Sequence, residues 1–242
     1  MPENITPYKD SSLGKKEQVA KMFDTISGNY DGLNRVISFG IDVKWRKKVL
    51  QLVTKTNPKT ILDIATGTGD LAILMSQTNA DKIIGLDISS GMLEVGRKKI
   101  EAKKLTHKIE LLLADSENMP FENNTFDAIT VAFGVRNFEN LEQGLSEILR
   151  VLRPGGKLVV LECSRPTLPV VKTLYNFYLN VITPLVGRLV SKNKNAYQYL
   201  NDSVQNFPER KTFVEILNKL GYKNASCKTL SLGICSIYCG EK

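Results

Sequence analysis

The stretch ILDIATGTGD, residues 61–70, joins a run of β-branched and aliphatic residues directly to a glycine-rich turn with a carboxylate on each side. The apolar run predicts a strand that is buried on both faces. The turn predicts a tight connection into a helix, because glycine adopts backbone conformations that other residues avoid. A strand, a glycine turn and a helix in this order are typical of the first ligand-binding loop of an α/β protein.

Short apolar runs alternate with helical patterns from residue 60 onward. The runs are residues 60–65, 82–89, 109–115, 126–134 and 156–164, and the helical patterns between them are 71–77, 91–104 and 141–152. Strands that are apolar on both faces and separated by helices indicate a parallel sheet covered on each side. The sequence therefore predicts a doubly wound α/β fold with a mostly parallel sheet.

The C-terminal segment predicts an antiparallel addition to this sheet. Residues 208–222 have a helical pattern, with Pro208 expected at its start and Gly221 at its stop. Two apolar runs follow, at 225–233 and 234–242, close enough to form a hairpin. We therefore expect seven strands, with at least one antiparallel pair near the sheet edge.

Two helical regions lie outside the alternating pattern. Val19, Met22, Phe23, Ile26 and Tyr30 recur at helical spacing and predict an amphipathic helix over residues 15–30 that needs a core to cover. We therefore expect an N-terminal helical cap at 1–50 and a main α/β domain at 51–242.

A helical insertion without strands is expected within the main domain, at 166–207. In it, Lys172, Asn176 and Asn180 recur every fourth position and leave a wide apolar face, and Pro184 is expected to break or kink the helix. This face is either buried beneath the insertion or forms a wall for a lipophilic substrate.

Composition and charge narrow the classes of protein. The 242 residues include 33 Lys and Arg against 25 Asp and Glu, a net charge of +8, with basic runs at 44–48 and 97–104. Such runs are solvated helix faces, or they contact an anionic membrane or nucleic acid. The polar N-terminus and the lack of an 18-residue apolar run favour a cytoplasmic protein. Four cysteines without CxxC spacing and a single histidine predict neither a disulfide framework nor a metal site.

The charges around the glycine turn help to identify its ligand. Asp70 would stand beside a pyrophosphate bound at the start of the following helix and would repel it, which disfavours NAD. S-adenosylmethionine carries an ammonium and a sulfonium, for which Asp63 and Asp70 are favourable neighbours. The N–H groups of the turn Gly67-Thr68-Gly69 are expected to receive its carboxylate. The sequence therefore predicts S-adenosylmethionine as the cofactor.

Carboxylates also end the next two strands. Asp87 lies 20 residues after Gly67, where a carboxylate accepts hydrogen bonds from ribose hydroxyls; its alternative role is a helix cap. Asp115 is expected to accept from the adenine amino group, and Ser116 to meet the adenine ring through its backbone; the alternative is a simple turn. Both strand ends point to the same edge of the sheet, which supports a nucleoside site there.

Two stretches carry a resemblance to a known family. YDGLNRVISFGIDVKW (30–45) is similar to a Tyr-Asp-x-Met-Asn signature ending in Trp, and RVLRPGGKLVVLECS (150–164) fits Arg-Val-x-Lys-Pro-Gly-Gly…Glu-x-Ser. With FGVRN (133–137), they resemble the UbiE/MenG family of class I S-adenosylmethionine-dependent methyltransferases, over roughly residues 15–242. The departures from the family pattern are Leu33 for Met, Asp42 for His, Arg153 for Lys and Ala132 for Ser.

The resemblance implies C-methylation of a polyprenylated quinol in menaquinone or ubiquinone biosynthesis. Demethylmenaquinol is the expected substrate, and a benzoquinol is the alternative. By position, Thr68, Asp87, Asp115 and Ser116 match the family's cofactor contacts. The prenylated substrate and the basic runs suggest peripheral association with the inner face of an anionic membrane. The oligomeric state stays open, a homodimer included.

Four residues are candidates for catalysis. Arg136 and Asn137 follow the fourth strand at the ligand-binding edge. Because a guanidinium stays protonated, Arg136 is expected to stabilise an anionic oxygen or orient a water, unless it forms only a surface salt bridge. Tyr30 and Asp31 of the cap are expected to complete the site, unless they only form a turn. Glu162 either faces the acceptor or anchors the end of its strand. His107 is rejected as a catalytic residue, because it lies in the loop before the third strand, at the opposite edge of the sheet.

Three other classes compete with this hypothesis. The first is a methyltransferase for a small soluble phenol, amine or acid. The second is a nucleic-acid-binding module. It is disfavoured because the basic runs lack interleaved aromatic residues. The third is a cofactor-binding regulator without turnover, which the intact FGVRN motif disfavours.

Overall fold

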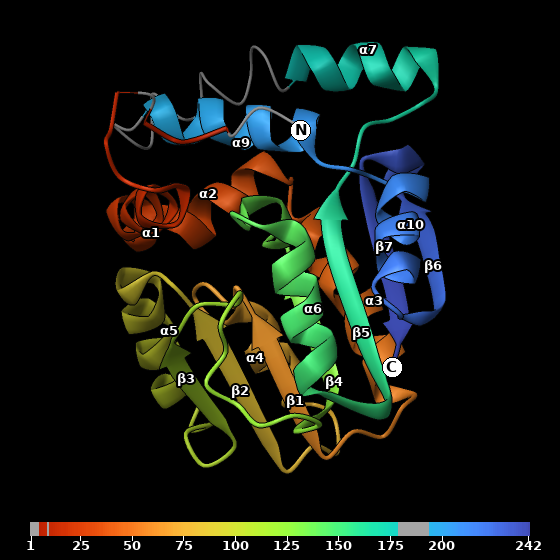
Figure 1. Ribbon diagram of the computed structural model, residues 1–242. Coiled ribbons are helices and arrows are strands. Elements are labelled where there is room, and N and C mark those ends of the chain that lie inside the picture. Colours follow the sequence, from red (N-terminus) through yellow and green to blue (C-terminus); the bar gives the residue numbers. More distant parts are fainter. Residues whose placement is uncertain (1–4, 9, 179–193) are drawn as a thin grey trace.

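The computed structural model describes residues 5–8, 10–178 and 194–242. Its centre is a seven-stranded sheet with the strand order β3-β2-β1-β4-β5-β7-β6 (Figure 1). The strands are β1 (Thr60–Ile64), β2 (Lys82–Asp87), β3 (Ile109–Leu113), β4 (Phe126–Ala132), β5 (Leu152–Cys163), β6 (Lys223–Leu230) and β7 (Cys235–Glu241).

Strands β1 to β5 pair in parallel, and β7 pairs antiparallel with both β5 and β6. This is the expected mostly parallel, doubly wound fold, and its C-terminal hairpin supplies the antiparallel pairs. The carboxyl ends of the five parallel strands meet at one edge of the sheet, where open α/β sheets bind their ligands.

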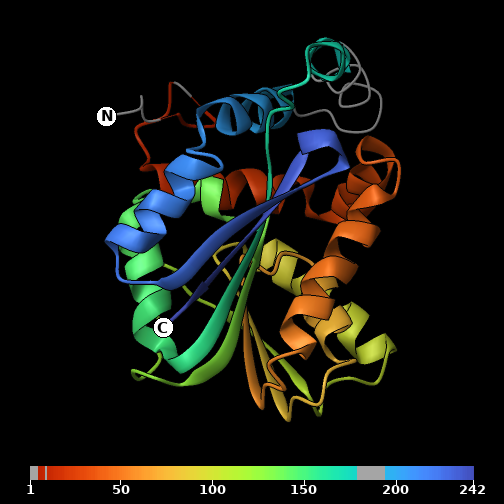
Figure 2. The ribbon, with the colours of Figure 1, turned by 90° about the vertical axis from the view of Figure 1, so that its right-hand side faces the viewer.

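Helices cover both faces of the sheet (Figure 2). They are α3 (Ile41–Thr54), α4 (Asp70–Met75) and α5 (Ser90–Ala102) on one face, and α6 (Leu141–Val151) and α10 (Lys211–Lys219) on the other. Successive strand residues contribute to opposite faces: Ile61 packs with α3 and α4, and Leu62 packs with α6. Because both faces are buried, the strands are apolar throughout.

A third group of helices lies over the carboxyl edge of the sheet (Figure 1). It consists of α1 (Lys15–Ile26), α2 (Tyr30–Ile37) and α9 (Lys194–Asn206). Val19 and Met22 of α1 form a small apolar cluster with Ala196 and Tyr199 of α9. The N-terminal cap and the end of the insertion therefore build one roof over the ligand-binding edge, although they are far apart in the sequence.

The structure corrects two expected helix boundaries. The first helix ends at Ile26, and a 3-10 turn (η1, Ser27–Asn29) separates it from α2, because Ser, Gly and Asn have low helix propensity. The C-terminal helix begins at Lys211 and not at Pro208. Arg210 before it has a φ of 56°, which no helix can include, and its N–H donates to the Tyr238 hydroxyl at 2.8 Å.

Gly221, with a φ of 97°, ends α10 as predicted. Helix α7 (Pro169–Phe177) opens the insertion, and the expected kink at Pro184 lies outside the described residues. None of the helices within the described ranges combines the length and apolar character that crossing a bilayer requires.

Candidate functional site

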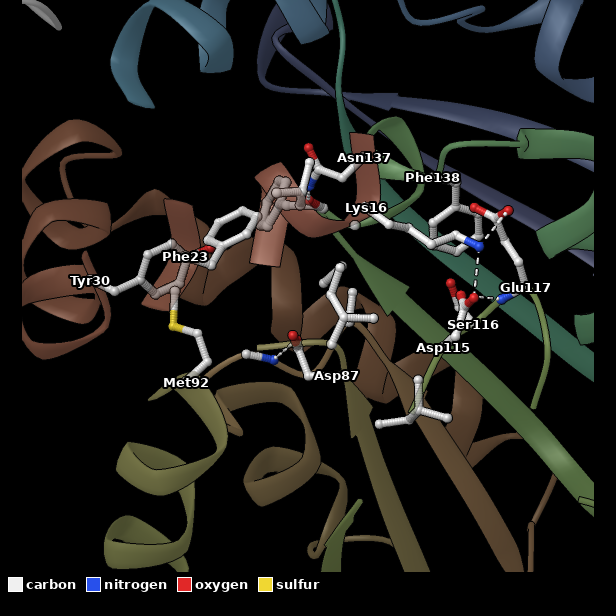
Figure 3. A pocket seen from close by; sticks show the side chains of 18 residues that line it. Lys16, Phe23, Tyr30, Asp87, Met92, Asp115, Ser116, Glu117, Asn137 and Phe138 are labelled. Carbon is white, nitrogen blue, oxygen red and sulfur yellow. Dashed lines mark hydrogen bonds and ion pairs between the residues drawn. The ribbon is translucent and has the colours of Figure 1, made fainter. Parts of the chain in front are cut away.

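A cavity of about 640 Å³, its open mouth included, lies at the carboxyl ends of β1, β2 and β4. Figure 3 shows its walls: Phe23, Tyr30 and Met92 on one side, Asp87 at the base, and Lys16 with Asp115, Ser116 and Glu117 on the other side. We call it the first cavity. It brings together Gly67, Asp87, Asp115 and Ser116, which the sequence predicts as cofactor contacts, and Tyr30 and Asn137, which it predicts as catalytic.

The glycine turn gives the first cavity its base. Gly67 and Gly69 have φ values of 57° and 77°, a left-handed conformation that strains a residue with a side chain. In this conformation the Gly67 N–H donates to Asp87 Oδ2 at 2.7 Å, and the chain enters α4 directly after Gly69. The turn therefore holds the Asp87 carboxylate at the cavity.

Asp87 is buried, and burial raises the pKa of its carboxyl. Its Oδ1 accepts from the Ser89 N–H at 2.9 Å, so each oxygen already has one backbone donor. Because a carboxylate oxygen accepts two hydrogen bonds, one acceptor position on each oxygen is left for a ligand. This arrangement can receive two neighbouring hydroxyl groups.

The opposite wall combines two carboxylates with one cation. Lys16 Nζ lies 2.7 Å from Asp115 Oδ2 and 3.1 Å from Glu117 Oε2 (Figure 3). Asp115 Oδ1 accepts from the Glu117 N–H at 2.9 Å, which fixes the carboxylate against its loop. Carboxylates outnumber cations around the cavity, so its lining fits a ligand with hydroxyl and amino donors and disfavours phosphates.

A larger cavity of about 1150 Å³, open mouth included, adjoins the first. We call it the second cavity. It lies among α1, α2, α3, α7 and α9, and Phe23, Tyr30, Phe133 and Asn137 line both cavities. Its lining is mainly aromatic and aliphatic. The residues that line it include Leu33, Trp45, Arg136, Cys163, Tyr178 and Tyr199.

Arg136 provides a buried charge beside the second cavity. Its Nη1 donates to the Phe133 carbonyl at 2.7 Å and forms an ion pair with Glu162 Oε1, and both side chains are almost fully buried. Burial alone would lower the pKa of Arg136, but the adjacent Glu162 carboxylate raises it above its ordinary value. The alternative role considered for Arg136 was a surface salt bridge, but its ion pair with Glu162 is buried. The guanidinium stays charged at every working pH.

Several predicted site residues line neither cavity. Asp63 is buried behind the glycine turn and accepts from the Thr66 and Thr130 hydroxyls at 2.6 and 2.7 Å; burial raises its pKa to about 6. Gly69 closes the turn by donating to the Thr66 carbonyl at 2.9 Å.

Asp31 and Thr68 belong to an ionic network outside both cavities. Asp31 accepts from the Thr68 hydroxyl and from Lys99 Nζ, each at 2.6 Å. Asp70 accepts from Lys99 at 2.5 Å and from Arg35 at 3.1 Å. The network ties α2 to α4 and α5, and Asp70 is already neutralised by two cations.

The lining residues that are not among the predicted site residues include Lys16, Glu117 and Tyr199. Lys16 and Tyr199 reach the site from α1 and α9, helices whose patterns give no sign of a ligand. Glu117 follows Asp115 by two residues, and its position beside that predicted contact is the one signal that could have found it. Within the described ranges, no three His, Cys, Asp or Glu side chains gather as metal ligands.

Sequence comparison gives clear relatives. The model of the ubiE/COQ5 methyltransferase family matches residues 11–242. The chain is 43% identical to a demethylmenaquinone methyltransferase of Bacteroides fragilis, covering 99% of this chain and 98% of that protein. It is also 43% identical to the ubiquinone/menaquinone biosynthesis C-methyltransferase UbiE of Geotalea daltonii, covering 94% and 97%.

Structural comparison shows the same fold in more distant proteins. A SAM-dependent methyltransferase of Thermotoga maritima aligns with a TM-score of 0.65 at 18% identity, covering 92% of this chain and 99% of that one. A SAM-dependent methyltransferase of Aquifex aeolicus aligns with a TM-score of 0.58 at 18% identity, covering 81% and 88%. The class I methyltransferase fold is thus shared where little sequence similarity is left.

Proposed function

Because the chain belongs to the ubiE/COQ5 methyltransferase family, we propose that it transfers a methyl group from S-adenosylmethionine to a ring carbon of demethylmenaquinol. The observation that carries this proposal is the pair of adjoining cavities. One has a carboxylate-lined base, and the other is larger and lipophilic with a buried cation. They share a wall of Phe23, Tyr30, Phe133 and Asn137, across which a methyl group has a short path.

The residues of the first cavity fit the cofactor. Asp87 has the free acceptor positions for the two ribose hydroxyls, and Asp115 and Ser116 face the place for the adenine. The bound cofactor supplies an electrophilic methyl group on a positively charged sulfur. Asp31 is proposed to act indirectly, because its bonds to Thr68 and Lys99 hold the glycine turn against α2.

The residues of the second cavity fit the acceptor. A ring carbon becomes strongly nucleophilic when a neighbouring hydroxyl is ionised, and the buried Arg136 cation stabilises that oxyanion. Tyr30 and Asn137 stand at the shared wall and position the ring against the donor side. The roof of α1, α2 and α9 covers this junction.

The direct test is radiolabelled methyl transfer from S-adenosylmethionine to reduced demethylmenaquinone, for the wild type, Asp87→Ala and Arg136→Ala. Asp87→Ala should lose affinity for S-adenosylhomocysteine in calorimetry. Arg136→Ala should keep that affinity and lose turnover, because it lines only the second cavity. Uptake of NAD without any binding of S-adenosylmethionine or its demethylated product would refute the proposal.

A benzoquinol is the second candidate acceptor, because one similar protein is named for both ubiquinone and menaquinone biosynthesis. The same assay with a prenylated benzoquinol separates the two acceptors by kcat/KM.

We further infer that the second cavity faces a lipid surface and receives the prenyl tail. Val170, Leu174 and Phe177 are 73%, 64% and 59% exposed and recur on one side of α7. Phe39, 82% exposed, contacts Tyr178 of the cavity with ring centroids 5.8 Å apart. Exposed apolar side chains gathered at one place on a surface commonly mark a contact site. The division into a cap and a main domain, and the oligomeric state, stay predictions.

A further inference from the structure

Three buried polar atoms gather beside the second cavity and have no hydrogen-bond partner among the residues that the structure describes. They are Arg136 Nε, Glu162 Oε2 and the Tyr199 hydroxyl. They come from three separate elements: η2 (Val135–Asn137), β5 and α9. Arg136 and Tyr199 line the second cavity, and α9 packs directly on η2. A buried polar atom without a partner is unfavourable, so a cluster of them at a cavity indicates a ligand.

In each side chain of the Arg136–Glu162 ion pair, one polar atom is hydrogen-bonded and another has no partner in the described part of the chain. Glu162 Oε1 accepts from Arg136 Nη1 and from the Cys163 N–H, the latter at 2.8 Å, whereas Oε2 accepts from no donor in the described part of the chain. Arg136 uses Nη1 for Glu162 and Phe133, whereas Nε donates to no acceptor there. Because neutralising Glu162 would leave the buried guanidinium unpaired, the carboxylate stays ionised and offers only acceptor positions.

Tyr199 adds a neutral hydroxyl to this pair. The side chain is 3% exposed, and burial raises the pKa of its phenol to about 12, with Arg136 and Glu162 close enough to act on it electrostatically. It therefore keeps its proton and can donate one hydrogen bond. The cluster as a whole offers two donors, Arg136 Nε and Tyr199, and one acceptor, Glu162 Oε2.

We propose that Tyr199, Arg136 and Glu162 together bind a ring hydroxyl of the acceptor and thereby select the reduced quinol over the oxidised quinone. A hydroxyl donates its proton to Glu162 Oε2 and accepts from Arg136 or Tyr199. A quinone oxygen has no proton, so it leaves Glu162 Oε2 without a partner. This inference rests on the proposed function and assigns Tyr199 a substrate-binding role.

The test measures binding without turnover. Trp45, the chain's only tryptophan, lines the second cavity, so its fluorescence reports occupancy. A 2-prenyl-1,4-naphthoquinol, kept reduced without oxygen, and its quinone are titrated into the protein loaded with S-adenosylhomocysteine. The wild type should prefer the quinol by about tenfold or more, and Tyr199→Phe should weaken quinol binding by about three- to tenfold, as expected for one lost hydrogen bond. Glu162→Gln should lose the preference, because an amide can donate to a quinone oxygen.

Tyr222→Phe is the matched control. Tyr222 is also 3% exposed, but its hydroxyl donates to the Leu145 carbonyl at 2.7 Å, away from both cavities. Tyr222→Phe should lower the Tm and keep the quinol preference. Tyr199→Phe should keep or raise the Tm of the ligand-free protein, because it removes an unpartnered hydroxyl. If Tyr199 has only a structural role, Tyr199→Phe should instead lower the Tm and leave quinol binding unchanged.

The two levels of the proposal fail in different ways. If Tyr199→Phe binds the quinol as tightly as the wild type, or if the wild type binds quinol and quinone equally, the hydroxyl receptor is wrong while methyl transfer stands. If the wild type binds S-adenosylhomocysteine but neither binds nor methylates the quinol, the proposed function itself is wrong.

Discussion

Asp63 illustrates how a predicted site residue can serve the fold at the scale of a single side chain. It lies in the strand before the glycine turn, is 1% exposed, and bridges Thr66 of the turn to Thr130 of β4. The bridge holds the turn against the neighbouring strand. A carboxylate in this place is costly, since it has hydrogen bonds but forms no ion pair with any residue that the structure describes.

The pH dependence of stability should report this cost. Burial raises the pKa of Asp63 to about 6 in the folded chain, against 3.8 for the free side chain. Between these values the folded chain holds a proton that the unfolded chain has released, so stability falls as pH rises through this window and stays reduced above it. Relative to Asp63→Asn, the wild type should lose up to about 3 kcal/mol between pH 4 and pH 7 in urea unfolding. Parallel pH profiles of the two proteins would contradict this expectation.

Gly134 of the FGVRN motif is required for a different reason. A Cβ at this position would lie 2.4 Å from the Cβ of Ala65 in the glycine-rich loop. Gly134→Ala should therefore separate the two loops, lower the free energy of unfolding by about 1–3 kcal/mol and displace Arg136. Gly32→Ala in α2 is the control: no atom lies within 4 Å of the added Cβ, and helix propensity should raise stability by up to about 1 kcal/mol. Equal effects of the two variants in chemical denaturation would show that the close approach is not needed.

At the scale of an element, α1 is a lid whose two ends are held by different contacts. Near its start, Lys16 pairs with Asp115 and Glu117 at one wall of the first cavity. Near its end, Asp24 Oδ1 accepts from the Ser89 hydroxyl at 2.6 Å and from the Gly91 N–H at 2.8 Å, at the N-terminus of α5. The helix therefore depends on the loop after β3 for the position of its first turns.

Lys16→Met should loosen that end of α1 alone. Amide hydrogen exchange in the first turns of α1 should become faster, while exchange in the sheet stays unchanged, because local opening needs only local contacts to break. Lys21→Met, which changes an exposed lysine of the same helix, should leave both regions as they are. Unchanged exchange in Lys16→Met would mean that the ion pairs are not needed, and that the Lys15 hydrogen bonds to Phe138 and Glu139 and the apolar cluster with α9 hold the helix.

In the molecule as a whole, the exposed apolar side chains of α7 lie at one end, beyond the roof. The sheet and its two helical layers form the lower part of Figure 1, and α7 lies beyond the roof at the opposite end. Apolar exposed side chains of α7 and the basic side chain of Lys172 lie at this end. A bilayer that meets this end of the molecule would contact α7, which lines the second cavity together with α2.

Vesicle flotation should detect this orientation. Replacing Val170, Leu174 and Phe177 by Ser should reduce co-flotation with anionic vesicles several-fold and leave the Tm unchanged, because these side chains are exposed. Leu113→Ser removes an exposed leucine at the β3 edge and should have no effect on flotation. Binding should also weaken as salt rises or as anionic lipid is removed. If the triple variant floats like the wild type, α7 is not the contact.

The fold class and part of the site follow from the amino-acid sequence alone. Alternating apolar runs and helical patterns predict the sheet with its two helical layers, and Gly67 and Asp87 can be placed from local chemistry. These features depend on spacing along the chain and on backbone conformations that few residues adopt. They are therefore visible without knowledge of what packs where.

Which side chains share a cavity could be seen only in the tertiary structure. Tyr199 and Arg136 line one cavity despite 62 intervening positions, because α9 packs on η2, and Lys16 reaches Asp115 from α1. The structure also shows that Asp63 and Asp31 line neither cavity and that the Arg136–Glu162 pair is buried. Burial and hydrogen bonding between distant segments result from packing, and packing has no local period in the sequence.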